Sequence, residues 1–328
     1  MASLERTAYP RFPKVLSAQD LQVCYTPSPD ELEWARRSSR GHSPRLGLLV
    51  LLKIFQRLHY FPPVDSIPPP IVEHVRAAAN LNVDVPLPDY DRKASPILFR
   101  HYRTVRSWLN VKPYYGTDAN EIATRAAHEA SQSMDQPVDL VNATIEALVA
   151  QNIELPAFST LDLIAEQIHA KAQARLFRLV SRRLSNAQKR IFDRLLARDL
   201  SQRQTDYHRV KRHAKRPSRQ NLDLLINQMT WLDGLGDFAV ALAGIPTTIL
   251  RSLAAQAETL DASALKTDTH PDKRYTLIAA LLNRMRVRVR DDLAEMFVRR
   301  MGAAISPPDI RRTRYRPADA LLKFLQAL

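Results

Sequence analysis

The sequence has 328 residues but a single cysteine, Cys24, so the chain cannot form an internal disulfide or a cluster of thiolate metal ligands. A lone thiol fits a reducing compartment. Glycine is also scarce, with seven residues, and neither G-x-G-x-x-G nor G-x-x-x-x-G-K-[ST] occurs. Because the phosphate-binding loops of nucleotide-binding folds need such glycines, we expect no cofactor and no nucleotide-dependent enzyme.

Long apolar runs are missing as well. The run Leu46–Leu52, for example, is followed by Lys53 and is far too short to cross a bilayer. No apolar stretch precedes Pro10, so we expect no signal peptide. These observations predict a cytoplasmic protein with no membrane partner.

Recognisable catalytic and metal-binding patterns are equally scarce. The nine histidines are scattered without an H-E-x-x-H pattern. One acidic group, Asp291, Asp292 and Glu295, resembles the carboxylates of a two-metal site, but it falls in a helical pattern with no supporting sheet. We interpret these acids as partners of nearby arginines, and predict no catalytic residue, no bound metal and no small-molecule substrate.

Positive charge is what the chain has in excess. Lys and Arg number 48 against 34 Asp and Glu, giving a net charge of +14. Residues 171–219 hold sixteen of these cations and three acids, a net +13, so nearly the whole excess lies in one stretch. Such a concentration favours a polyanionic partner, of which nucleic acid is the usual one and an anionic membrane surface the rival.

Apolar residues recur at helical spacing along most of the chain. Ser28 opens a capping box for a helix from Glu31 to about Arg40. Ser43 is expected to cap the following apolar helix, which Pro62 and Pro63 should end. A second helix at residues 71–80 follows, which resembles a helix-turn-helix, although the connection is longer than in that motif.

The basic segment 98–109 has two faces. We expect an apolar stripe to be buried, made by Phe99, Tyr102, Val105, Trp108 and Leu109. The opposite face would then present Arg100, Arg103 and Arg106 with His101 alongside, as suits a major groove or a phosphate track. The alternative is a solvated amphipathic helix.

Further helices are predicted to the C-terminus, among them residues 160–184, a helix opened by a Ser185 capping box, and a long helix at 277–303. The fold class is therefore mainly α, with several helical bundles and helix-turn-helix-like DNA-binding modules. We expect three domains: a helical DNA-binding domain at 1–113, a second at 114–205, and a basic linker with a helical domain at 206–328.

Several motifs together resemble the N-terminal region of Tn-three family transposases. The first three run from Arg40 through Arg45 to Gly47, from Tyr90 to Arg92, and from Arg100 to Leu109. The most specific is Ile153–Asp162, and weaker similarities lie at Asp233–Gly236 and Arg290–Phe297. Asn110 stands where the family usually has glycine, which leaves the local turn open.

The resemblance implies that the chain binds DNA and that it lacks the catalytic part of the family. Helical N-terminal domains of this family recognise the terminal inverted repeats of the transposon, while an RNase H-like core with an Asp-Asp-Glu triad follows in the C-terminal half. We expect this chain to stop before that core, and so to bind double-stranded DNA in the bacterial cytoplasm, at the nucleoid, without strand-transfer chemistry. A homodimer is compatible with this interpretation.

Twelve residues are predicted to contact DNA. The expected groove contacts are Arg100, His101, Arg103 and Arg106. The expected phosphate contacts are Arg40, Arg45, Arg92, Lys112, Lys211, Arg212, Lys215 and Arg216. Two other functions stay open: a helical scaffold that binds proteins, and an autonomous metal-dependent nuclease using Asp291, Asp292 and Glu295.

Overall fold

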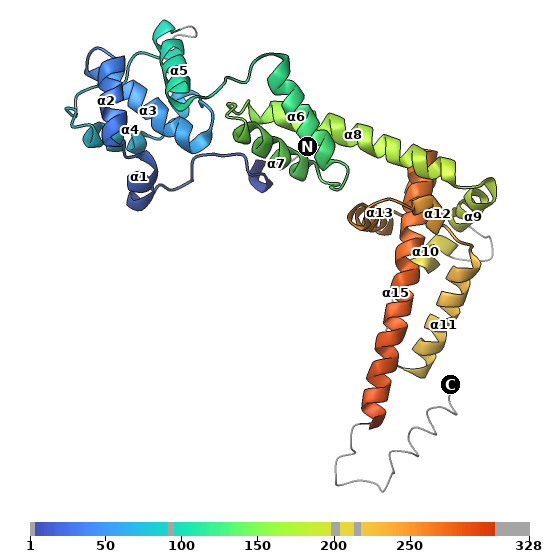
Figure 1. Ribbon diagram of the computed structural model, residues 1–328. Coiled ribbons are helices and arrows are strands. Elements are labelled where there is room, and N and C mark those ends of the chain that lie inside the picture. Colours follow the sequence, from blue (N-terminus) through green and yellow to red (C-terminus); the bar gives the residue numbers. More distant parts are fainter. Residues whose placement is uncertain (1–3, 91–94, 198–203, 213–217, 306–328) are drawn as a thin grey trace, which may run out of the picture. The chain divides into compact units, whose positions relative to one another are not determined.

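The computed structural model describes residues 4–90, 95–197, 204–212 and 218–305. Within these ranges the chain forms fifteen α-helices and two short 3-10 helices, no strand, and one isolated parallel bridge between Lys112 and Ile153 (Figure 1). The prediction of a mainly α fold is confirmed. No helix of the described ranges has the length and apolar character that a membrane span requires.

The chain divides into two compact units, Met1–Ala170 and Lys171–Leu328. The predicted helix-turn-helix character and the predicted three-domain division stay predictions.

The first core of unit 1 surrounds one central helix. It contains α1 (Ala18–Tyr25), α2 (Pro29–Ser38), α3 (His42–Leu58), α4 (Pro69–Ala78) and α5 (Pro96–Leu109). Every residue of α3 from Leu46 to Phe55 is buried, because α1, α2, α4 and α5 all pack against it. An apolar helix covered on all sides is the usual solution for such a sequence.

A buried ion pair joins α2 to α3. The Nζ of Lys53 lies 3.2 Å from the carboxylate of Glu31, and the side chains are 11% and 10% exposed. Glu31 also accepts a hydrogen bond from the backbone N–H of Ser28, so the predicted capping box is confirmed. One carboxylate therefore caps α2 and neutralises a lysine inside the core.

The predicted capping residue of α3 was wrong, and the helix ends before it reaches the prolines that were expected to stop it. The helix begins at His42 after Gly41, whose φ of +92° is in the region that favours glycine, and Ser43 makes no capping hydrogen bond. The helix ends at Leu58, where His59 adopts a left-handed conformation and its N–H bonds to the carbonyl of Phe55. The αL residue therefore stops the helix before Pro62 is reached.

Gly47 is the point of closest approach between α3 and the segment before α5. A Cβ atom at this position would lie 2.0 Å from the hydroxyl of Tyr90 and 2.7 Å from the ring of Pro88. The same Tyr90 hydroxyl is 2.7 Å from the Nδ1 of His101 on α5. The absence of a side chain at Gly47 thus lets Tyr90 reach α5.

The second core of unit 1 uses small residues. It contains α6 (Gly116–Ala130), α7 (Pro137–Ala150) and the first half of α8 (Phe158–Arg183). Ala119, Ala123 and Ala127 line the buried face of α6, which allows α7 to pack closely against it. Leu140, Leu148 and Leu161 fill the remaining interior.

Segment 151–157 connects this second core to the first through main-chain hydrogen bonds. Lys112 donates to the carbonyl of Asn152 and accepts from the N–H of Glu154, while Leu155 donates to the carbonyl of His59. We call this segment the clasp.

Unit 2 is built around its long last helix. It contains the second half of α8, then α9 (Asn186–Leu196), α10 (Asp206–Val210), α11 (Arg219–Gly234), α12 (Ala239–Leu242), α13 (Thr247–Thr259), α14 (Ala262–Thr267) and α15 (Pro271–Ile305). Residues 277–282 of α15 are fully buried, with α11 and α13 packed against the helix. The predicted Ser185 capping box of α9 and the predicted final helix are both confirmed.

Arginines of α15 are mostly tied to neighbouring elements. Arg286 donates to the carbonyl of Leu232, and Arg290 lies 2.9 Å from a carboxylate oxygen of Asp233. Arg284 and Arg288 both approach Glu258, at 3.5 and 3.6 Å. These cations therefore stabilise unit 2 and are not a free basic surface.

Candidate nucleic-acid interface

Four cations form a narrow row along the second half of α8. Lys171, Arg175, Arg178 and Arg182 follow one another at steps of four, three and four residues, and all four are exposed. With 100° per residue they lie within roughly 60° of one another, along about 16 Å of helix. We call these residues the α8 stripe.

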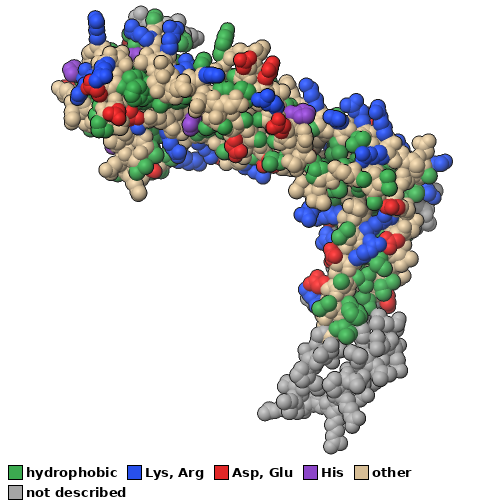
Figure 2. Space-filling view, in the orientation of Figure 1, with side chains coloured by type: hydrophobic (Ala, Val, Ile, Leu, Met, Phe, Trp, Pro, Cys, Tyr) green, Lys and Arg blue, Asp and Glu red, His purple; other side chains and the backbone are tan. Residues whose placement is uncertain are grey.

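Nothing acidic interrupts the α8 stripe. The sequence has no Asp or Glu between Glu166 and Asp193. Among the described residues, none of the four makes an ion pair with a carboxylate, in contrast to the arginines of α15. Figure 2 shows blue side chains gathered over this half of the helix.

The next helix adds two more exposed cations. Arg190 and Arg194 are one turn apart on α9 and line an open hollow together with Ala187, Ile191, Asp193 and Ala197. Arg183, at the end of α8, instead donates to the carbonyl of Ala243, 2.7 Å away. Some cations of residues 171–219 therefore make internal contacts, and others are exposed to solvent.

Among the twelve residues predicted to contact DNA, five have exposed side chains: Arg40, Arg100, Arg103, Lys112 and Arg212. Arg45 is partly buried, and its Nε is enclosed without a hydrogen-bond partner in the described part of the chain. Arg92, Lys215 and Arg216 lie outside the described residues. The remaining three, His101, Arg106 and Lys211, have internal partners.

The predicted apolar stripe of α5 is confirmed in part, since Val105 is fully buried and Tyr102 and Leu109 pack against the first core. Phe99 and Trp108, expected inside, are 57% and 43% exposed, whereas His101, expected on the free face, is only 4% exposed. Its Nδ1 pairs with the Tyr90 hydroxyl, and burial followed by the nearby charge of Arg100 lowers the pKa of His101 to about 4. In this conformation His101 is enclosed, so its ring does not face a groove.

The buried His101 makes the stability of unit 1 depend on pH. The unfolded histidine has an ordinary pKa near 6.5 and the folded one about 4, so the unfolded state binds the extra proton between these values. We expect unfolding free energy to fall by about 2 kcal/mol from pH 7.5 to 5 through this group. Urea unfolding of wild type and His101→Gln at several pH values measures the difference. The control His128→Gln, which removes an exposed histidine on α6, should keep the wild-type dependence of stability on pH. The same dependence in His101→Gln would contradict the assignment of this effect to His101.

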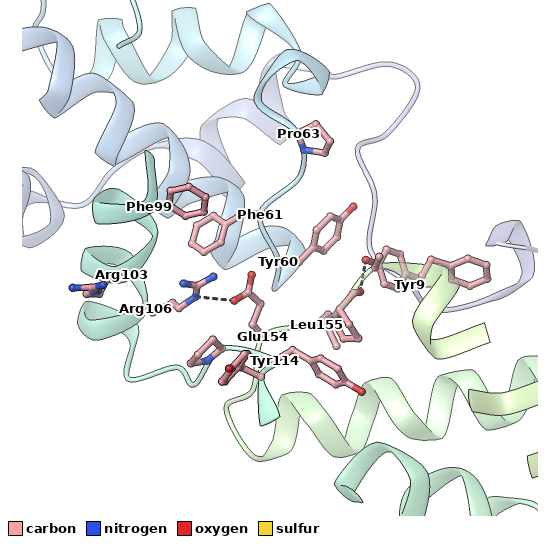
Figure 3. A pocket seen from close by; sticks show the side chains of 15 residues that line it. Tyr9, Tyr60, Phe61, Pro63, Phe99, Arg103, Arg106, Tyr114, Glu154 and Leu155 are labelled. Atoms are coloured by element: carbon pink, nitrogen blue, oxygen red, sulfur yellow. Dashed lines mark hydrogen bonds and ion pairs between the residues drawn. The ribbon is translucent and has the colours of Figure 1, made fainter. Parts of the chain in front are cut away.

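Arg106 is also an internal group, where a groove contact was expected. Its Nε lies 2.7 Å from a carboxylate oxygen of Glu154 in the clasp, and the two side chains are 25% and 13% exposed. The guanidinium also sits over the rings of Phe61 and Tyr102. The pair ties α5 to the clasp (Figure 3).

Lys211, expected on a phosphate, is partly buried in unit 2. Its ammonium donates to the carbonyl of Leu260 and lies 4.4 Å from the centre of the Tyr207 ring. Burial lowers the pKa of Lys211, against the opposite influence of Glu258 and Asp261. Its side chain therefore caps the end of α13 rather than extending into solvent.

Of the three acids Asp291, Asp292 and Glu295, one has the predicted arginine partner. Glu295 pairs with Arg299 one turn away, whereas Asp291 and Asp292 form no ion pair within the described ranges. In the described portion of the chain, no three His, Cys, Asp or Glu side chains are grouped so that they could hold a metal ion.

The α8 stripe is the part of the surface that sequence reasoning did not single out by residue. The signal was present, because the 4-3-4 spacing and the lack of acids are both visible in the sequence. The motifs that carry the family resemblance contact one another in the structure. Gly47 lies against Tyr90, Tyr90 bonds to His101, and Arg106 pairs with Glu154.

Two comparisons with known proteins relate to this arrangement. The family model described as domain of unknown function (DUF4158) matches residues 1–168. A transposase for transposon Tn1546 from Enterococcus faecium is 20% identical over 292 residues. The match covers 87% of this chain but 29% of that relative, so the chain spans less than a third of the relative's length.

Proposed function

Because the chain belongs to the family defined by the domain of unknown function DUF4158, and is distantly similar to a transposase, we propose that it binds double-stranded DNA as a transposase region. The observation that carries the proposal is the α8 stripe, four exposed cations on one helix face with no carboxylate between them. Such a row matches the regular charge of a phosphate backbone.

The finer proposal concerns what is recognised. We propose that the DNA is a terminal inverted repeat, with the α8 stripe on phosphates. In unit 1, Arg100 and Arg103 are the candidates for base contacts, supported by their exposure one turn apart on α5. Arg40, Lys112 and Arg212 are exposed candidates for phosphate contacts. The proposal assigns the chain no strand cleavage of its own.

A salt titration tests the DNA-binding proposal. Each phosphate contact contributes roughly −0.9 to the slope of log K against log salt concentration. The four stripe cations and at least two from unit 1 therefore predict a slope of about −5 or steeper. Fluorescence anisotropy with a labelled blunt duplex at 50 to 300 mM salt measures it, and an inverted-repeat duplex should bind more tightly than a scrambled one of equal length.

Two results would favour the other functions. Affinity for a duplex that is absent or independent of salt would indicate a protein-binding scaffold. Magnesium-dependent cleavage of the duplex would indicate a nuclease.

A further inference from the structure

A hollow of about 970 Å³ opens in unit 1 between α5 and the clasp, and it is unusually aromatic (Figure 3). Seven aromatic side chains line it, although aromatic residues make up only 7% of the chain. Its volume falls within the range of small-ligand sites. The hollow thus has the size and the rings to hold one flat group.

Two of these rings are largely open to solvent. Tyr115 is 87% exposed, and Phe99 is 57% exposed although it makes an edge-to-face contact with Tyr102, with the ring centres 6.4 Å apart. By contrast, the Tyr9 hydroxyl donates to the carbonyl of Pro156 at 2.8 Å, and Tyr9 itself belongs to the second core. Large exposed rings at the edge of a hollow leave faces on which another planar group can stack.

The charged side chains of the lining indicate which kind of ligand the hollow could hold. Arg106 and Glu154 both line the hollow but neutralise each other at 2.7 Å. Arg103 lines it as well, and its exposed guanidinium forms no ion pair within the described ranges. The lining therefore keeps one positive charge beside the exposed rings, which matches a planar group attached to an anion.

We propose that this hollow binds one unpaired nucleotide of DNA, its base stacked on Phe99 and Tyr115 and its phosphate held by Arg103. The proposal rests on the DNA-binding function, and adds that unit 1 binds single-stranded or extruded bases. Arg103, a candidate for base contacts on duplex DNA, would hold a phosphate when the bound nucleotide is unpaired. Duplex bases are stacked on each other and cannot offer their faces, whereas unpaired bases stack on aromatic side chains. An apolar peptide would fill the hollow without using Arg103.

The test uses the full chain and two DNA probes. One is a twelve-residue oligothymidylate with a central 2-aminopurine, whose fluorescence is quenched by stacking, and the other is a blunt duplex. The double variant combines Phe99→Leu, which keeps helix propensity, with Tyr115→Ser, which keeps a good N-cap for α6. Trp108→Leu is the control, since it removes a partly exposed ring of the same helix that stacks on Trp34 and lies outside the hollow.

We expect the double variant to lose roughly fivefold to a hundredfold in oligonucleotide affinity, together with the 2-aminopurine quenching. Arg103→Gln should weaken oligonucleotide binding while preserving the quenching at saturation. The Trp108 control should match wild type on the oligonucleotide, and blunt-duplex affinity of the double variant should be unchanged.

Wild-type quenching and affinity in the double variant would overturn the inference, even if the duplex still binds. Equal losses on oligonucleotide and duplex would overturn it too, because the rings would then act on DNA generally. Oligonucleotide binding without duplex binding would support the hollow and refute the duplex proposal. The two failures are therefore distinguishable.

Discussion

Replacing Gly47 with alanine is expected to lower the unfolding free energy of unit 1 by roughly 3–5 kcal/mol. The new Cβ would lie 2.0 Å from the Tyr90 hydroxyl and 2.7 Å from Pro88, so the segment that holds them must move. Moving it breaks the contact of Tyr90 with His101 and leaves two buried polar groups without partners. A loss of this size is a large part of the stability of an ordinary domain.

Thermal and urea unfolding followed by circular dichroism measure the effect. Gly234→Ala is the matched control, because the residue is helical and a Cβ added there would meet no atom within 4 Å. We expect that control to be neutral or stabilised by up to about 1 kcal/mol. Adding Tyr90→Phe to Gly47→Ala removes the nearest clashing atom and should restore part of the loss. Wild-type unfolding of Gly47→Ala would show that the 88–90 segment moves away from α3 at little cost.

The second large effect is expected from neutralising the α8 stripe. Changing Lys171, Arg175, Arg178 and Arg182 to glutamine removes four phosphate contacts if the proposal is right. The slope of log K against log salt should become shallower by roughly 3 to 4, and affinity at 0.1 M salt should fall about a thousandfold. Glutamine is a good helix former, so α8 should stay folded.

A loss of net charge must be distinguished from the loss of cations at the α8 stripe itself. The double variant Arg175→Gln and Arg178→Gln should lose roughly fiftyfold in affinity at 0.1 M salt. Arg251→Gln with Lys266→Gln makes the same change in net charge at exposed sites of α13 and α14, and we expect it to lose only a few-fold. Equal losses in the two double variants would mean that net charge attracts DNA and that the α8 stripe is no special contact.

Local signals in the sequence predicted much of the fold. Ser28 and Ser185 each open a helix through a capping box that involves residues only three positions apart. The helical spacing of residues 277–303 correctly predicted the last helix. Such features depend on neighbours in the chain, which a sequence displays directly.

The internal partners of His101, Arg106 and Lys211 could not be obtained in this way. His101 is enclosed with Tyr90, whose hydroxyl enters over Gly47, 43 residues earlier in the chain. The carboxylate partner of Arg106, Glu154, is 48 residues away. The acceptor of Lys211, the carbonyl of Leu260, is 49 residues away.

The clasp makes contacts through both main-chain hydrogen bonds and one side-chain ion pair, and the two kinds of contact restrict its sequence differently. Lys112, Asn152 and Leu155 join the two halves of unit 1 through backbone N–H and carbonyl groups, which every residue except proline supplies in full. Substitution at the exposed Lys112 can therefore be extensive while the connection persists. Asn152 has a φ of +52°, which favours asparagine or glycine, and the buried Leu155 must stay apolar. Glu154 is different, because its carboxylate neutralises Arg106, and only a paired exchange of both residues would preserve that link.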